Sequence, residues 1–441
     1  MSHIFPRHTK KLPPVVSHGE GVFLHDRSGK RYFDGSGGAA VSCLGHSDQA
    51  VTEAIKAQLD HLAFAHTGFF TSEPAEALAR KLITHAPGQL DRVYLVSGGS
   101  EAMESALKLA RQYFLEIGQP ERRHVIARRQ SYHGNTLGAL ATGGNQWRRD
   151  PFEPLLVETH HISPCYAYRG QQENESEHDY GQRVANELEE RILLLGPENV
   201  MAFVAETVVG ATAGAVTAVP GYFKRVREIC DTHGVLLILD EVMCGMGRTG
   251  TLFACEQEEV SPDICAIAKG LGAGYQPIGA MLCTKEIYNA IEDGSGSFQH
   301  GHTYLGHPTA AAAALAVLTR LTDDGVAKRV TPMGKLLQSE LNHAFGQHPH
   351  IGDIRGRGLF LGLEIVADKD TKTPFPREQK TAETLKAAAF EAGLICYPMN
   401  GTIDGKDGTH ILLAPPFIME EQHIALIIDG LSTALSGIRS N

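Results

Sequence analysis

The sequence predicts an α/β fold in which a large, mostly parallel sheet forms one domain and a smaller α+β domain accompanies it. Short, continuously apolar segments alternate with helical stretches through the first three quarters of the chain, a pattern typical of a parallel sheet covered on both faces. The last quarter instead carries several strands before one closing helix. The chain has 441 residues, 42% of them hydrophobic, which is enough for a large core and a companion domain.

The N-terminal part begins with a predicted hairpin. Residues 21–34 read GVFLHDRSGKRYFD, in which apolar and aromatic residues flank a cluster that favours a turn. Residues 48–61 and 72–84 then carry apolar positions at helical spacing, with Pro74 near the start of the second helix. We assign residues 1–60 to the N-terminal segment of the smaller domain.

The large domain is predicted over residues 61–325. Five short apolar strands are each followed by polar or glycine residues: Arg92–Val96, His124–Ala127, Val200–Ala205, Val235–Leu239 and Ile264–Ala268. Ligands in parallel sheets bind at the carboxyl ends of the strands, so the residues just after these strands are the candidates for chemistry. The polar stretch at 166–190 lacks apolar periodicity, and we expect it to be an inserted surface loop.

Residues 326–441 are predicted to form the C-terminal part of the smaller domain. Three segments, GLFLGLEI, GLICYP and HILLAPPF, have the composition of strands. The segment EEQHIALIIDGLSTAL has the apolar spacing of an amphipathic helix.

Composition excludes several classes of protein. The net charge of −11 disfavours binding to the phosphate backbone of nucleic acids. We expect a cytoplasmic protein, because the first residues lack an apolar signal core and no apolar run reaches membrane-spanning length. The eight cysteines form no CxxC pair, which favours buried free thiols, and the 22 histidines form no compact ligand motif. No disulfide and no metal site is therefore expected.

A glycine turn before a helix is the first candidate for ligand binding. The sequence SGGS at 97–100 directly precedes a helical stretch, so backbone N–H groups and the helix dipole converge on one point where an anion fits. Glu101 and Glu104 also suit the first turn of a helix. A helix that is merely well capped is an equal alternative.

A carboxylate and a lysine follow two other strands. Asp240 ends the apolar run LLILD, where it could be a structural or metal-binding acid, or could hold a protonated ring nitrogen. Lys269 ends a further apolar strand, where desolvation lowers its pKa and frees the amine as a nucleophile, although such lysines are often ion-paired instead. A phosphate cradle, a carboxylate and a lysine at three strand ends together match pyridoxal phosphate, with Lys269 as its Schiff-base residue.

A dinucleotide-binding dehydrogenase is the rival enzyme class. Gly245, Gly247 and Gly250 form a literal GxGxxG after a strand. That fingerprint requires the glycines to open a helix at once, whereas the following TLFACEQEEVSPD has little helical periodicity and soon reaches Pro262. The sequence therefore disfavours a dinucleotide site.

The segments SGGSEAMESALKLAR, SYHGNT, AETVVG, LLILDEV and AKGLGAGYQPIGA together resemble the class III (omega) aminotransferases of the pyridoxal-phosphate, aspartate-aminotransferase-like superfamily. The resemblance runs from about Gly21 to the C-terminal helix. It implies the type I pyridoxal-phosphate-dependent transferase fold and pyridoxal 5'-phosphate as cofactor.

The resemblance also assigns roles to individual residues. It implies that Gly99 and Ser100 bind the phosphate, Tyr132 stacks on the pyridine ring beside His133, Asp240 pairs with the ring nitrogen, Val242 packs under the ring, and Lys269 forms the Schiff base. Glu206 matches a cofactor-site glutamate of the family, although Thr207 replaces the proline that usually follows it. Thr303 in GHTYLGHP matches a threonine donated to the phosphate of the neighbouring subunit, which implies a homodimer with a shared active site, with a tetramer as an open alternative.

The usual residues for binding a substrate carboxylate are missing. Asn135, Leu412 and Tyr397 stand where different relatives have an arginine, and Tyr397 is therefore a candidate substrate residue. Either another basic residue such as Arg355, Arg357 or Lys406 binds a carboxylate, or the pocket prefers less anionic amines. Arg355 and Arg357 are expected to serve the RGRG turn. The loop NGTIDGKDGTH could fold over the entrance or could be a solvated turn.

The expected activity is transfer of an amino group from an ω-amino acid or amine to a keto acid such as pyruvate, by a ping-pong mechanism through the Lys269 aldimine. A decarboxylase, racemase or aminomutase on the same fold is the second hypothesis. A noncatalytic binding protein on this fold is the third.

Overall fold

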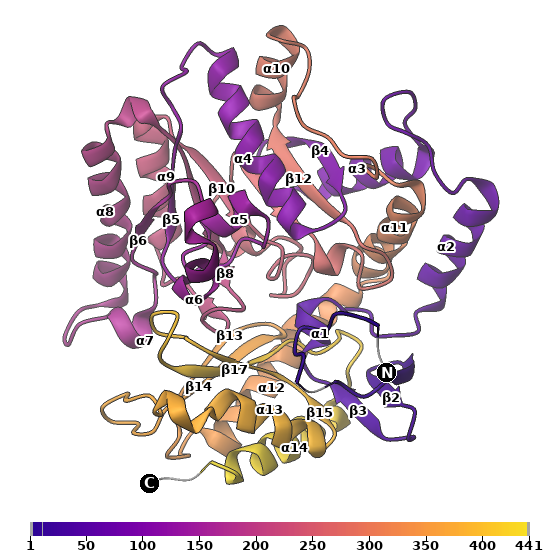
Figure 1. The fold of residues 1–441 in the computed structure, drawn as a ribbon, viewed down its shortest axis with the longest axis vertical. Helices are drawn as coiled ribbons and strands as arrows, with labels where there is room; N and C mark the ends of the chain where they lie inside the picture. The colour runs from indigo at the N-terminus through magenta and orange to yellow at the C-terminus, as the bar shows by residue number, and fades with distance from the viewer. Residues whose placement is uncertain (1–2, 11, 439–441) are drawn as a thin grey trace.

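The computed structural model describes residues 3–10 and 12–438, and its largest element is a seven-stranded sheet in the upper half of Figure 1. The strand order is β4-β12-β11-β10-β7-β5-β6. Their bounds are β4 Leu90–Val96, β5 His124–Arg128, β6 His160–Ile162, β7 Val200–Glu206, β10 Leu236–Asp240, β11 Ile264–Ile267 and β12 Gly279–Thr284. Strand β12 pairs antiparallel with β11 and β4, whereas β5, β6, β7, β10 and β11 are mutually parallel. The predicted α/β class and the five predicted strands are confirmed.

Helices cover both faces of this sheet. They are α2 Gln49–His61, α3 Glu73–His85, α4 Gly99–Glu116, α8 Glu177–Leu195, α9 Tyr222–His233, α10 Lys285–Asp293 and α11 Pro308–Thr322. Along β5, Ile126 packs into one apolar cluster while Val125 and Ala127 pack into another. This alternation explains why the strands read as continuous apolar runs, because neither face meets solvent.

The segment 166–190, expected to be a surface loop, is mostly helical. Ser176 caps α8 by accepting a hydrogen bond from the backbone N–H of Asp179, and α8 packs against α9. Tyr180, Val184 and Leu188 recur every four residues and are buried. The expectation was wrong because the polar residues at 171–179 hide a helix start, after which the spacing is that of an amphipathic helix.

The smaller sheet and its helices lie below the large sheet in Figure 1. This four-stranded sheet has the order β13-β14-β17-β16, with β13 Ile351–Arg357, β14 Phe360–Ile365, β16 Tyr397–Asn400 and β17 Thr409–Leu413. The helices here are α12 Val330–Phe345, α13 Thr381–Glu391 and α14 Ile424–Ser436. The closing helix and the three C-terminal strand segments are confirmed.

The N-terminal hairpin joins this lower region. Strands β2 Phe23–Asp26 and β3 Arg31–Asp34 pair as predicted, β1 Val16–Glu20 extends the sheet, and β15 Leu394–Ile395 pairs in parallel with β3. Helix α2 packs instead against α11. Because β3 pairs with β15, we propose that residues 1–60 and 326–441 together form the smaller domain and that residues 61–325 form the larger one. Helix α2, although within 1–60, lies on the larger domain.

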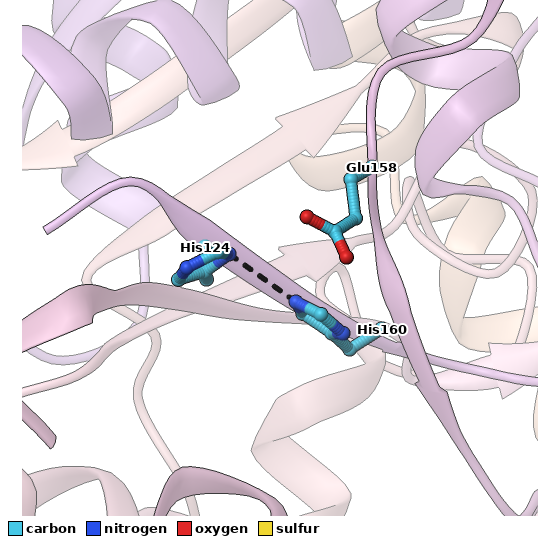
Figure 2. Close-up of side chains that lie close together, drawn as sticks. All are labelled: His124, Glu158 and His160. Carbon is cyan, nitrogen blue, oxygen red and sulfur yellow. Dashed lines mark hydrogen bonds between the residues drawn. The ribbon is translucent and has the colours of Figure 1, made fainter. Parts of the chain in front are cut away.

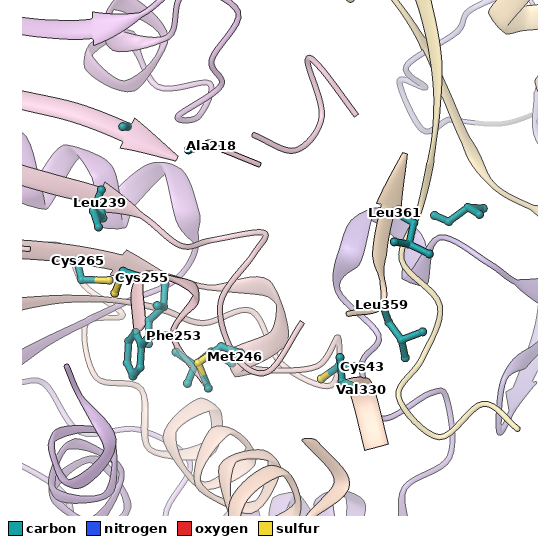
Figure 3. Packing of buried hydrophobic residues seen from close by; sticks show 14 of the residues in the cluster. Cys43, Ala218, Leu239, Met246, Phe253, Cys255, Cys265, Val330, Leu359 and Leu361 are labelled. Carbon is teal, nitrogen blue, oxygen red and sulfur yellow. The ribbon is translucent and has the colours of Figure 1, made fainter. Parts of the chain in front are cut away.

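One hydrophobic core runs through both regions. In Figure 3, Cys265 lies beside Cys255 and Phe253 under the large sheet, and the same cluster reaches Leu359 and Leu361 of the smaller region. All eight cysteines are buried free thiols, as the sequence predicted. Within residues 3–10 and 12–438, every helix is too short or too polar to cross a membrane.

Shorter elements connect these parts. They are α1 Gly37–Ala40, α5 Leu137–Thr142, α6 Gln146–Arg149, α7 Ala167–Gly170, β8 Val208–Val209 and β9 Val216–Thr217. Residues 241–253, which contain the GxGxxG sequence, form turns and no helix. The glycines therefore lack the helix N-terminus that a dinucleotide pyrophosphate needs.

Candidate active site

A cavity of about 430 Å³ opens at the carboxyl ends of the central strands. Eight of the residues singled out from the sequence line it: Gly99, Ser100, Tyr132, His133, Glu206, Asp240, Val242 and Lys269. They follow or end β4, β5, β7, β10 and β11, because parallel strands present their carboxyl ends at one edge. The fold thus brings together residues that lie up to 170 positions apart in the sequence, from Gly99 to Lys269.

The glycine turn at the start of α4 forms one wall of the cavity. Gly98 is the N-cap of α4, and a Cβ built on it meets nothing within 4 Å. A Cβ on Gly99 would lie 2.8 Å from Cγ1 of Val242. The turn therefore leaves an open space in front of the first N–H groups of α4. Position 99 must be glycine because a larger residue would collide with Val242.

Asn135 fixes the position of Ser100. Oγ of Ser100 donates a hydrogen bond to Oδ1 of Asn135 at 2.8 Å and accepts one from the backbone N–H of Asn135 at 3.0 Å. The sequence marked Asn135 only as the site of a missing arginine. Its contacts indicate that it instead orients the serine hydroxyl at the edge of the anion cradle.

Asp240 is held by His133 at the base of the cavity. Oδ2 of Asp240 lies 2.9 Å from Nδ1 of His133, and Oδ1 accepts a hydrogen bond from the backbone N–H of Val242 at 2.9 Å. Asp240 is 4% exposed and His133 is 2% exposed. The carboxylate is therefore fixed in orientation and shielded from water, which strengthens its interaction with a cation in the cavity.

Glu206 contacts the backbone. Its Oε1 accepts from the N–H of Tyr132 at 3.0 Å and its Oε2 accepts from the N–H of Gly210 at 2.9 Å. Burial raises the pKa of this carboxyl, while His133 lowers it and Asp240 raises it. Glu206 lines the cavity and joins the turn that carries Tyr132 to the segment after β7.

Lys269 lies two residues after the end of β11 and lines the same cavity as Asp240. Its backbone has a φ of 42°, an unfavourable conformation for a residue with a side chain, which is typical of functional sites. Burial lowers the pKa of the Lys269 amine, whereas the charges of Asp240 and Glu206 raise it. Desolvation outweighs the two carboxylates, so a larger fraction of the amine is neutral and able to act as a nucleophile or base.

Two predicted residues lie outside the cavity lining. Thr303 is exposed in the turn that precedes α11. Tyr397 is half-buried at the start of β16, where it pairs with Leu412 and packs against the cluster that contains Met243, a cavity residue. The single chain therefore does not bring Thr303 to the other eight residues.

The basic residues suggested for a carboxylate are occupied elsewhere. Arg355 is partly buried and donates to Asp353, Glu364 and the carbonyl of Gly214, and Arg357 forms an ion pair with Glu258 at 2.5 Å. Lys406 is exposed in the turn between β16 and β17. This turn, at 401–408, lies against α6, because a Cβ on Gly405 would be 3.0 Å from the backbone nitrogen of Gln146.

The sequence did not single out Arg148, which lies on α6 behind Tyr132. Its guanidinium carbon is 4.6 Å from the centre of the Tyr132 ring. Its Nε is buried without a hydrogen-bond partner, and within the described part of the chain no carboxylate forms an ion pair with it. Helix α6 has only four residues and shows no recognisable pattern in the sequence. The position of Arg148 beside the cavity is therefore evident only in the folded chain.

Comparison with known proteins gives one consistent result. The family model described as aminotransferase class-III matches residues 4–435. An uncharacterized aminotransferase of Schizosaccharomyces pombe is 46% identical and covers 99% of this chain and 95% of its own length. An (S)-enantioselective omega-transaminase from Thermomicrobium roseum has a TM-score of 0.92 at 37% identity, covering 99% of this chain and 96% of that chain. An omega transaminase from Pseudomonas jessenii in complex with PMP has the same TM-score at 32% identity, with the same coverage.

Proposed function

We propose that this chain, which belongs to the class-III aminotransferases, moves an amino group from an ω-amino acid or amine to a keto acid such as pyruvate. Family membership makes it a pyridoxal-phosphate-dependent transaminase that takes an amino donor and a keto-acid acceptor. The observation that carries the finer proposal is the convergence of Lys269, Asp240 and the glycine turn in one cavity, with an unpaired arginine beside it.

The residues of the cavity fit pyridoxal phosphate. The open space at Gly98 and the hydroxyl of Ser100 suit the phosphate, and the buried carboxylate of Asp240 suits a protonated ring nitrogen. We propose that Tyr132 and Val242 enclose the ring from its two faces. Lys269 would then hold the cofactor covalently.

A cofactor-affinity measurement tests the glycine wall. Gly99→Ala should weaken binding of pyridoxal phosphate by about tenfold or more, because the new methyl group would displace Val242 into the ring's position. The affinity is measured by titrating cofactor-free protein and following protein fluorescence. The double variant Gly99→Ala/Val242→Ala should recover part of the affinity, and unchanged binding by the single variant would contradict this placement.

Lys269 is proposed as the catalytic base. Bound pyridoxal phosphate withdraws electrons from the carbon that bears the amino group, which makes its hydrogen acidic. Once the substrate amine has replaced Lys269 on the cofactor, the freed neutral Nζ of Lys269 would take this proton and later return it. His133 keeps the carboxylate of Asp240 oriented, and the buried cavity excludes water that would compete for the proton. We propose that donor and acceptor react in turn, in a ping-pong sequence.

Arg148 is proposed to bind the carboxylate of the substrate. An arginine without an acidic partner beside a pocket is suited to bidentate recognition of a carboxylate. Its stacking on Tyr132 fixes the plane of the guanidinium, and α6 together with the 401–408 turn borders the same side of the cavity. This arrangement favours amino donors or acceptors with a carboxylate distant from the reacting carbon.

Steady-state kinetics test Arg148. Arg148→Met should raise KM about 10- to 100-fold for β-alanine or 4-aminobutyrate, because a charge-assisted hydrogen bond is worth about 1.5–3 kcal/mol. The KM for 1-phenylethylamine, which has no carboxylate, should change little. Arg80→Met, at an exposed position of α3, is the matched control. Equal losses for both amines would assign Arg148 a structural role instead.

A homodimer with a shared active site is also proposed. Thr303 is exposed outside the cavity, and Tyr304, Phe69 and Phe70 expose large apolar surfaces, at 60%, 82% and 68% of their area. Such exposure is typical of surfaces that another subunit covers. Thr303 of one subunit would then reach the phosphate held by its partner. A tetramer and a cytoplasmic location remain sequence predictions.

Isotope transfer distinguishes transamination from other reactions on this fold. With ¹⁵N-labelled amine and either pyruvate or 2-oxoglutarate, the label should appear in alanine or glutamate. Its appearance in neither would favour the decarboxylase, racemase or aminomutase hypothesis. A chain that turns over no amine would favour the noncatalytic hypothesis.

A further inference from the structure

A cluster of three metal-ligating side chains lies at the other end of the large sheet, away from the cavity. It consists of His124, Glu158 and His160, whose ligand atoms all lie within 4.8 Å of one another. Figure 2 shows the carboxylate of Glu158 turned toward the two imidazole rings. Within residues 3–10 and 12–438, this is the single group of histidine, cysteine and carboxylate side chains with such spacing.

The pairing of two strands creates the cluster. His124 opens β5 and His160 opens β6, and His160 is the register partner of Ile126. Since side chains two residues apart share one face of a strand, His124 and His160 project from the same face. Glu158 precedes His160 by two residues, in the segment that leads into β6, and its carboxylate lies near both rings.

The nitrogen spacing is that of two ligands of one metal ion. Without an ion, Nε2 of His160 forms a hydrogen bond with Nδ1 of His124 at 3.2 Å. In a tetrahedral zinc site with Zn–N bonds of about 2.0–2.1 Å, two nitrogen ligands stand about 3.3–3.4 Å apart. We propose that His124, His160 and Glu158 bind a divalent cation of the zinc class, with the fourth position open to solvent beside the exposed Glu158.

The ligand types indicate the class of metal. Imidazole and carboxylate ligands together suit zinc better than calcium or magnesium, which prefer oxygen alone.

The position of the site indicates a structural role. Both histidines stand at the amino ends of their strands, whereas Asp240 ends β10 at its carboxyl end, so the metal would take no part in amino transfer. Strand β6 has only three residues and lies at the edge of the sheet. An ion bound by His124 and His160 would fasten this short edge strand to β5.

The sequence predicted no metal site, whereas the folded chain brings these three side chains together. That expectation rested on the lack of a compact motif, and His124 is far from Glu158 and His160 along the chain. Only the parallel pairing of β5 with β6 brings them together. The site is independent of the proposed function, because none of its residues lines the cavity.

The test is zinc binding by the untagged holoenzyme. After dialysis against a chelator, zinc titration with a competing indicator dye should show one saturable site per chain. His124→Gln and His160→Gln should each weaken it at least tenfold, since even outer-shell changes cost that much. Glu158→Gln, at an exposed position that does not threaten folding, should weaken it too. Zinc should raise the Tm of the wild type and not of His160→Gln.

A matched histidine separates this site from general surface binding. His343→Gln, at an exposed position in the last turn of α12, should bind zinc as the wild type does. Cu²⁺ in the wild type should give an electron paramagnetic resonance spectrum with two nitrogen ligands, and one in His124→Gln. Equal zinc affinity in the wild type, His160→Gln and Glu158→Gln, or no saturable binding in the wild type, would overturn the proposal.

Discussion

Lys269→Ala is expected to lower kcat by at least about 10⁴-fold, because general acid–base catalysis alone contributes about 10²–10⁴ and the covalent attachment of the cofactor is lost as well. Lys269 lies two residues after the end of β11, and burial keeps a larger part of its amine neutral. Among the described residues that line the cavity, it is the single amine. Another side chain there is therefore not expected to replace both of its roles.

Chemical rescue and mass spectrometry check this expectation. Borohydride reduction should add the mass of the cofactor to the wild-type chain at Lys269 and leave the variant unmodified. Methylamine in the buffer should restore part of the variant's activity, since a small amine can enter the space left by the side chain. Lys285→Ala, at an exposed position that begins α10, serves as the control. Wild-type turnover by Lys269→Ala would refute the proposed mechanism.

The fold could be predicted to the extent that burial imposes a pattern on the sequence. The central strands are buried on both faces, so β7 and β10 appear as uninterrupted apolar runs. Strand β1 escaped prediction because its residues are almost all exposed and carry no alternation. Helix α8 was missed because its polar first turn resembles a loop. Strand β12 was not among the predicted strands, so its antiparallel pairing with β11 and β4 was not predicted either.

The candidate site could be predicted where a residue follows a strand or lies in a family motif. Asp240 and Lys269 carry that signal, and the cavity contains both. Asn135 and Arg148 lack it, because their roles depend on contacts with Ser100 and Tyr132 that only the folded chain creates. The motifs therefore point to the residues for the cofactor and leave the residues for the substrate unassigned.

Asp240→Asn is expected to lower kcat by at least about 10²-fold, the smaller of the two large effects. A nearby opposite charge shifts a pKa by about 1–3 units, so without the carboxylate the ring nitrogen of the cofactor would lose its proton at neutral pH. The amide oxygen of asparagine can still accept from the Val242 N–H, and its NH2 group can donate to Nδ1 of His133 in the tautomer that carries its proton on Nε2, so the change removes the charge and keeps the shape. The fold and cofactor affinity should therefore change much less than kcat.

Nitrogen NMR of the bound cofactor measures this effect directly. With ¹⁵N in the pyridine ring, the chemical shift should be that of a protonated nitrogen in the wild type and of an unprotonated one in Asp240→Asn. His133→Phe removes the partner of Asp240 while keeping its charge, so we expect the nitrogen to stay protonated and kcat to fall less. If Asp240→Asn kept a protonated pyridine nitrogen and nearly full kcat, Asp240 would not be the partner of that nitrogen. Its carboxylate would then have to face another cation, and Lys269 is the candidate. The geometry argues against that assignment, because among the described residues the ion-pair partner of Asp240 is His133 and not Lys269.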